Sequence, residues 1–449
     1  MKSFEFLNSK DSKNAPYSVN PSLWREAKLN YIPGIFKVVD GMYQARGFGL
    51  ANCTFVQGKT GWIVIYPLES GANALAAFDS LKSVLKGQSK LDSISAIIYT
   101  HSHVDHYGGV LGVLGLLKRG GSVYGPNGFL DHAISENTIA GNAMGRRATY
   151  MYGTLLPADT LQMVDAGLGV ALSKGPSGII PNNISVGGGI YKPDSIIIDS
   201  VKVHFWYTPG AEAPSEMMFY FPDLKALCAS EEVTHTMHNV YSLRGAKVRD
   251  ALAWSKFIDS TLTRFGDTAR VIFASHHWPL WGSENISRLL TTQRDLYRYI
   301  HDQSMRMANQ GSTPIEIAAK IKLPRSLDTV WANRGYYGTL SHNSKSVYNY
   351  YLGWFDGNPA NLNPLTPEEA GKKYVDFMGG PEATLTKAHA SYLAGDYRWA
   401  ATVLNNLVFA DPENNQARYL LADTYEQLGY QSESGPWRNF YLTGAEELR

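Results

Sequence analysis

The chain has little cysteine and almost no net charge. Cys53 and Cys228 are the only cysteines among its 449 residues, too few for a disulfide framework. Both lie in apolar, strand-like surroundings, so we expect buried thiols. The 41 lysines and arginines nearly balance the 40 aspartates and glutamates, which leaves a formal net charge of +1. This balance provides no long-range field for nucleic acid or an anionic membrane. Nucleic acid is therefore not expected as a partner, and any anion recognition must be local.

Long hydrophobic runs are also missing. The longest apolar stretch lies around residues 110–117, well short of the roughly 20 residues that cross a bilayer, so no membrane insertion is expected. The segment from Met1 to Asn14 is polar and has no hydrophobic signal region. As the chain stands, it predicts a cytoplasmic protein; a trimmed leader would instead predict a periplasmic or secreted one.

Up to about residue 290 the sequence alternates between strand and helix patterns. Two hairpins are predicted where Asp40-Gly41 and Gly58-Lys59 separate alternating apolar runs. Apolar residues at helical spacing predict helices over 72–86 and 247–263. Further strands are expected at 94–99, 201–207, 217–221, 226–229 and 269–274, with a Gly- and Pro-rich region at roughly 119–190. This alternation indicates an α/β sandwich.

The second part of the chain is predicted to be helical. Residues 1–300 are expected to form a first domain and residues 301–449 an all-α domain. Within 383–432, a pattern around Ala388 recurs 34 positions later around Ala422, a period typical of tetratricopeptide-like helical hairpins. One and a half such repeats cannot bury a core alone, so we expect this segment to dock on another surface.

The most informative motif is Thr-His-Ser-His-Val-Asp-His, which starts at Thr100. It follows a predicted buried strand and precedes an apolar stretch, 107–117, with the pattern of a helix. Open α/β sheets bind ligands at such strand ends. Imidazole and carboxylate groups suit zinc and other borderline metals. The metal-capable side chains are His101, His103, Asp105 and His106. Alternation places the first two on one side and the turn brings the last two to the other, so one loop can serve two adjacent metal ions.

Three later strand ends carry metal-capable groups as well. Glu212, Glu231 and His276 each follow a predicted apolar strand. Taken singly, each has an ordinary interpretation as a solvated glutamate or a hydrogen-bonded core histidine. As a set at strand ends, they are better interpreted as further metal ligands.

The His-x-His-x-Asp-His loop resembles the signature of the metallo-β-lactamase superfamily. Glutamates at 212 and 231, where ordinary β-lactamase-like enzymes have His and Asp, resemble the alkyl sulfatase (SDS hydrolase) family of that superfamily. Further stretches similar to this family are 212–217, 237–245, 274–279, 334–345 and 351–359. The resemblance implies an αββα sandwich followed by an all-α, tetratricopeptide-like domain.

The resemblance also implies a ligand set for two zinc ions per chain. His101, His103 and Glu212 would hold one zinc, and Asp105, His106 and His276 the second, with Glu231 bridging. Asn239 and Arg244 match sulfate-contacting positions, and a planar guanidinium suits a tetrahedral oxyanion. Tyr337 and His342 fall in matching stretches and are further candidates for substrate binding. His235 and His238 are the nearest titratable candidates for a proton donor.

The implied function is zinc-dependent hydrolysis of a small-molecule alkyl sulfate ester, such as dodecyl sulfate, to an alcohol and inorganic sulfate. Two alternatives stay open: another hydrolase of the same fold, of the lactonase or thioesterase type, and a catalytically impaired metal-binding homologue. The chain has Tyr66 where family members usually have Asp. It stops at Arg449, before the sterol-carrier-like domain that the family commonly adds. The resemblance also implies a homodimer joined through the helical region; the alternative is that this region packs on its own catalytic domain.

Overall fold

The structure is a computed structural model that describes residues 2–8, 14–187, 189 and 193–449. Residues 1 and 9–13 of the polar amino-terminal segment lie outside the described residues. Within the described parts, the strands form two facing sheets. The first has the order β1 (Gly34–Val39), β2 (Met42–Arg46), β3 (Cys53–Gln57), β4 (Trp62–Ile65), β5 (Ile94–Ile98), β6 (Leu117–Pro126) and β7 (Ile184–Val186). The second has the order β13 (Leu280–Trp281), β12 (Val271–Phe273), β11 (Ala226–Cys228), β10 (Met217–Phe221), β9 (Val201–Tyr207) and β8 (Asp194–Ile198).

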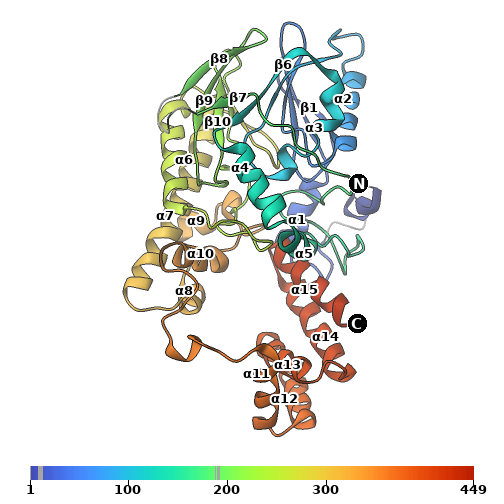
Figure 1. Cartoon of the computed structure of the whole chain (residues 1–449), viewed down its shortest axis with the longest axis vertical. Helices are drawn as coiled ribbons and strands as arrows, with labels where there is room; N and C mark the ends of the chain where they lie inside the picture. The colour runs from blue at the N-terminus through green and yellow to red at the C-terminus, as the bar shows by residue number, and fades with distance from the viewer. Residues whose placement is uncertain (1, 9–13, 188, 190–192) are drawn as a thin grey trace.

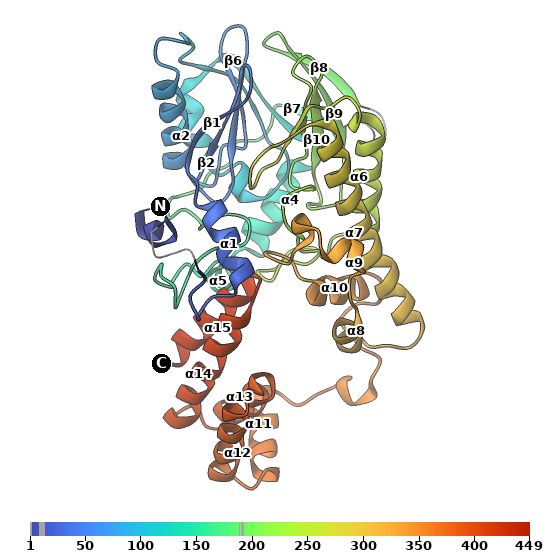
Figure 2. The same cartoon turned by 180° about the vertical axis from the view of Figure 1, so that it is seen from behind.

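Helices cover the outer faces of both sheets (Figures 1 and 2). Those of the sandwich are α1 (Pro21–Asn30), α2 (Gly71–Val84), α3 (Val110–Val113), α4 (Phe129–Ile134), α5 (Gly141–Met151), α6 (Ala251–Phe265) and α7 (Ser283–Asn309). Those that follow are α8 (Pro314–Lys320), α9 (Arg325–Asp328), α10 (Leu340–Leu352), α11 (Pro367–Phe377), α12 (Pro381–Leu393), α13 (Tyr397–Ala410), α14 (Asn415–Gln431) and α15 (Gly435–Leu448). No helix among the described residues is both long and apolar enough to cross a membrane.

Three hydrophobic layers hold the sandwich together, because successive side chains of a strand point to opposite faces. Ile63 and Ile65 of β4 join a core between the two sheets, which includes Phe205 of β9. Val64 points the other way and packs with Phe78 of α2. A third layer packs β9 and β10 against α6 and α7. The predicted αββα sandwich, followed by helices, is confirmed.

The hairpins and most strands lie where the alternation predicts them, but two local expectations, both about helices, are wrong. The expected helix over 107–117 is reduced to α3 and a 3-10 turn, Leu114–Leu116, and Leu117 already begins β6. The helix expected from residue 247 begins at Ala251, where the Asp250 side chain accepts hydrogen bonds from two backbone amides of its first turn. The Gly- and Pro-rich region contains β6, α4, α5 and β7.

The helical part extends away from the sandwich and then returns to it. After α10 an extended segment leads to α11–α13, which form a separate group at the bottom of Figure 1. The chain then returns through α14, and α15 packs against α5. The buried guanidinium of Arg438 in α15 donates hydrogen bonds to the carbonyl oxygens of Ser18, Thr160 and Gln162. The expected domain boundary at residue 300 falls inside α7 and stays a prediction.

Candidate metal centre

The predicted metal residues come from loops that meet at one edge of the sandwich. The loop after β5 carries the histidine motif. Glu212 follows β9, Glu231 follows β11 and His276 follows β12. These last three strands run in the same direction, so their carboxyl ends lie at the same edge. All seven predicted side chains therefore converge there.

The candidate ligand atoms form two groups, and within each group they lie within 4.8 Å of one another. The first group is His101, His103, Glu212 and Glu231, and the second is Asp105, His106 and His276. The side chains of the first group are all buried; in the second, Asp105 is partly exposed. The division matches the two-ion arrangement that the alternation of the loop predicts.

Glu231 contacts imidazoles of both groups. One carboxylate oxygen, Oε2, lies 3.0 Å from Nε2 of His101 and 2.9 Å from Nε2 of His106. The other oxygen, Oε1, lies 3.2 Å from Nε2 of His276. The carboxylate therefore lies between the two groups of candidate ligands.

The residues present fit a divalent metal. Nε2 of His101, His106 and His276 is buried and has no hydrogen-bond partner within the described parts of the chain. The same holds for Oε2 of Glu212 and Glu231. Buried polar atoms without partners are costly, and these are imidazole nitrogens and carboxylate oxygens aimed at one another. This donor set is the one that zinc and similar ions bind.

Neighbouring polar groups contact Nδ1 of two of these imidazoles, whose Nε2 atoms face the centre. Nδ1 of His101 lies 3.0 Å from the Thr100 hydroxyl, and Nδ1 of His276 lies 3.2 Å from the carbonyl oxygen of Leu50. Contacts of this kind set the ring orientation and the protonated nitrogen of a metal-binding histidine. The rings are thus already oriented toward the centre.

Arg244 lies at the rim of the centre and is anchored there. Its Nη2 is 3.6 Å from Oε2 of Glu136, and that same oxygen is 3.5 Å from Nε2 of His103. Its Nη1 donates a hydrogen bond to the carbonyl oxygen of Gly245 at 2.9 Å. Its side chain remains 16% exposed. A guanidinium is therefore held beside the metal residues with part of its surface open to a ligand.

The structure also brings His238, Tyr337 and Asn239 to this centre. Nε2 of His238 lies 3.0 Å from Oε1 of Glu231, and its ring centroid is 4.9 Å from that of Tyr337. The side-chain oxygen of Asn239 accepts a hydrogen bond from Arg249, whose guanidinium also pairs with Glu212. Of these predicted substrate or proton-transfer residues, His238 contacts a candidate ligand directly, and Tyr337 and Asn239 are each one side chain away from one.

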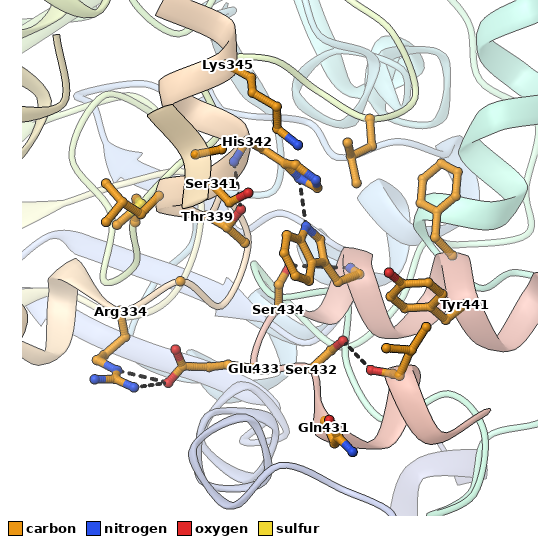
Figure 3. A pocket seen from close by; sticks show the side chains of 18 of the residues that line it. Arg334, Thr339, Ser341, His342, Lys345, Gln431, Ser432, Glu433, Ser434 and Tyr441 are labelled. Carbon is orange, nitrogen blue, oxygen red and sulfur yellow. Dashed lines mark hydrogen bonds and ion pairs between the residues drawn. The ribbon is translucent and has the colours of Figure 1, made fainter. Parts of the chain in front are cut away.

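The structure does not place His235 and His342 among the metal residues. His235 stacks on Trp278, its Nε2 lies 2.9 Å from the Trp278 carbonyl oxygen, and burial lowers its pKa to about 4. Nδ1 of His342 accepts a hydrogen bond from the Trp437 indole at 2.7 Å. His342 lines a cavity of about 990 Å³ between α8, α10, α14 and α15, where Figure 3 shows it near Lys345. Both histidines are engaged with tryptophan residues instead of with the candidate ligands.

Comparison with known families agrees with both halves of this structure. Residues 46–276 match the metallo-beta-lactamase superfamily, and residues 313–449 match the alkyl sulfatase dimerisation family. The chain is 47% identical over 452 residues to an alkyl/aryl-sulfatase, BDS1, of Saccharomyces cerevisiae; the match spans 100% of this chain and 68% of that protein. The chain belongs to the alkyl sulfatase family.

Other members of the alkyl sulfatase family are similarly close. A linear primary-alkylsulfatase from Pseudomonas sp is 51% identical over 444 residues, which are 98% of this chain and 65% of that protein. This chain thus spans about two thirds of the length of its curated relatives. Among solved structures, the stereoselective inverting sec-alkylsulfatase Pisa1 from Pseudomonas sp. superposes with a TM-score of 0.94 at 42% identity. That match covers 100% of this chain and 70% of the solved one.

Several residues that lie next to the candidate metal centre could not be predicted from the sequence. Glu136 lies on a π-helical turn, Ser135–Ile139, inside the Gly- and Pro-rich region, where no element is predicted. Arg249 precedes α6 and has no motif of its own. It contacts the centre through Glu212 and Asn239, and its backbone amide donates a hydrogen bond to the carbonyl oxygen of Val240. Glu216 is part of a recognised stretch, yet its burial behind the ligand loops becomes visible only in the fold.

Proposed function

We propose that the protein hydrolyses alkyl sulfate esters at a centre of two zinc ions, with dodecyl sulfate as a suitable substrate. The reaction is R–O–SO3⁻ plus water, giving an alcohol, sulfate and a proton. One observation carries the proposal: a two-group cluster of imidazoles and carboxylates lies beside a partly open arginine, in a chain closely related to alkylsulfatases.

The ligand assignment follows the two groups. His101, His103 and Glu212 would hold one ion, and Asp105, His106 and His276 the other, with Glu231 shared. Zinc in such a centre supplies activation of water and stabilisation of developing negative charge. The protein's part is to hold these side chains buried and oriented before substrate arrives.

Arg244 is proposed to bind the sulfate group. Its guanidinium presents parallel N–H donors that match a tetrahedral oxyanion, which a lysine cannot do. Glu136 contacts both the Arg244 guanidinium and His103. It therefore connects the proposed anion-binding residue to a proposed metal ligand. The sulfate oxygens would thus be bound next to the metal ions.

The test measures sulfate release from dodecyl sulfate by the zinc-loaded full chain. We expect Arg244→Ala and Arg244→Lys to lower kcat/KM by about 10- to 100-fold, because hydrogen bonds to charged groups contribute about 1.5–3 kcal/mol, with bound zinc unchanged. Arg298→Ala is the matched control, since Arg298 is an exposed arginine that pairs with Asp302 on α7.

Two results would contradict the proposal. Zinc-loaded protein that cleaves lactones or thioesters but no sulfate ester would favour another hydrolase of the same fold. Protein that binds about two zinc ions and hydrolyses none of these substrates would favour the impaired homologue. An Arg244→Ala variant with unaltered kinetics would remove Arg244 from the anion subsite.

We also propose that the helical region joins two copies of the chain. The match of residues 313–449 to a dimerisation family supports this assembly. So does the exposed apolar surface of α11–α13, which includes Phe377 at 91% and Leu393 at 72% exposure.

A further inference from the structure

Glu216 is a fully buried acidic side chain directly behind the candidate metal centre. Its backbone lies between the loops that carry the ligands. The backbone amide of Thr208 donates a hydrogen bond to the Glu216 carbonyl oxygen at 2.9 Å, and Glu216 forms an isolated antiparallel bridge with His101. It then leads into β10, the central strand between β9 and β11. Its position is therefore determined by both sheets.

The Glu216 carboxylate contacts the backbones of both candidate glutamate ligands. One oxygen, Oε2, accepts hydrogen bonds from the amides of Glu212 at 3.0 Å and Ala213 at 3.2 Å. The other oxygen, Oε1, accepts from the amide of Glu231 at 3.4 Å. The two loops follow different strands, so this single side chain connects them through their backbones.

The geometry requires a carboxyl group with two oxygens that can accept hydrogen bonds. Three N–H donors converge on two oxygens, and both oxygens accept. A glutamine offers a single acceptor, and its amide group would place N–H donors against one of the backbone amides. Buried donors that lose their acceptor cost about 1–3 kcal/mol each. An amide at position 216 would therefore release one of the two loops.

We infer that Glu216 is a positioning residue that sets the separation of Glu212 and Glu231, and through it the metal affinity of the centre. This inference rests on the proposed metal site and adds a residue that is not itself a ligand. Loss of outer contacts to metal ligands typically lowers metal affinity about 10–100-fold, and Glu216 serves two ligands at once.

The experiment titrates Co²⁺ into the metal-free full chain and follows its visible absorption and its competition with a chelating dye. We expect Glu216→Gln to bind Co²⁺ about 10- to 100-fold more weakly and to show a shifted absorption band at saturation. Glu216→Asp, with a shorter side chain that cannot span both loops, should show the same changes. A purely structural role would lower the melting temperature of the metal-free protein but leave the saturated Co²⁺ spectrum unchanged.

The matched control is Asp165→Asn. Asp165 is also a buried carboxylate, and it accepts a backbone hydrogen bond from Gly167 at 2.6 Å, but it lies outside the metal groups. We expect its Co²⁺ affinity and spectrum to match those of the unchanged chain.

Each outcome decides one question. Unchanged affinity and spectrum in Glu216→Gln, or an equal loss in Asp165→Asn, would overturn the inference. Failure of the unchanged chain to bind Co²⁺ would instead overturn the proposed metal centre. If Glu216→Gln does not fold, Glu216→Asp decides the comparison alone.

Discussion

His106 differs from the other loop histidines in the support that its ring receives. Its Nδ1 is buried and finds no hydrogen-bond partner in the described structure, whereas Nδ1 of His101 lies against a hydroxyl. Tyr66 packs edge-on against the His106 ring, with centroids 5.5 Å apart. The Tyr66 hydroxyl lies 3.0 Å from Sγ of Cys228. At this position, packing of an aromatic ring replaces the usual hydrogen bond to a metal-binding histidine.

Substitutions at Tyr66 test this replacement. We expect Tyr66→Phe to retain the bound metal and to lose about 1 kcal/mol of unfolding free energy, because the ring stays and one hydrogen bond is removed. Tyr66→Ala should lose about 3–5 kcal/mol through the cavity it leaves and should bind less metal. Urea unfolding and metal analysis of the purified variants measure both effects. Equal loss of metal in Tyr66→Phe would show that the hydroxyl, not the ring, supports His106.

At the level of single residues, the candidate metal ligands that the structure brings together could be proposed from the sequence, but the residues that contact them from other segments could not. His101 and Glu231 could be proposed because each is a metal-capable group where an apolar strand ends. Glu136 and Arg249 act through contacts between segments far apart in the chain, and such contacts leave no local pattern. His342 lay in a recognised stretch, but its α10 helix directs it toward Trp437.

Among the elements, the loop around Asp165 contacts both α1, through Asn30, and α15, through Asn439. Its carboxylate accepts hydrogen bonds from the Gly167 amide at 2.6 Å and from Nδ2 of Asn30 at 3.1 Å. Burial raises the pKa of Asp165 to about 7, against the lowering effect of these hydrogen bonds. The folded protein therefore keeps a proton there that the unfolded chain, with an ordinary aspartate pKa, loses near pH 4.

This difference predicts a pH-dependent stability. Because the folded state binds more protons than the unfolded state between about pH 4 and pH 7, the contribution of Asp165 to stability falls as pH rises through that window. We expect Asp165→Asn to be more stable relative to the unchanged chain at pH 8 than at pH 5. Urea unfolding of both proteins at the two pH values gives the comparison. An equal difference at both would show that Asp165 is ionised in the fold at pH 5.

Helices could be predicted from the sequence where one face of the helix is buried. They were missed where few residues of the helix are buried. The helix α2 buries Ala74, Phe78 and Leu81 at helical spacing, and its pattern is visible in the sequence. In α5 the one fully buried residue is Met151, so that helix has no apolar stripe to detect. It is held by α15, which comes much later in the chain.

At the scale of the whole molecule, the helical region divides into two parts with different surroundings. The last helix, α15, packs on the sandwich, whereas α11–α13 lie apart from it in both views (Figures 1 and 2). Phe377 and Trp399 of that group are 91% and 55% exposed. The segment predicted to need a docking surface, residues 383–432, falls on α12, α13 and α14. It therefore overlaps the exposed α11–α13 group and does not include α15.

We expect light scattering on the intact chain to report twice the mass of the 49.6 kDa protomer. Phe377→Ser and Trp399→Ser should shift the equilibrium toward monomer at micromolar concentration, because they remove apolar area from the proposed contact. Leu155→Ser is the control, since Leu155 is 70% exposed but lies outside the helical region. A monomeric intact chain would contradict the assembly.

The position of Arg438 has a consequence for biosynthesis. Its guanidinium connects the backbone of residue 18 with that of residues 160 and 162, yet the ribosome makes those segments hundreds of residues earlier. Every residue of the metal groups has also been synthesised by position 276. During translation, the nascent chain can therefore bring its candidate metal ligands together before Arg438 has been made. Until then, the amino-terminal segment lacks the hydrogen bonds that Arg438 donates to it. The packing around Ser18 can be completed only after α15 has left the exit tunnel.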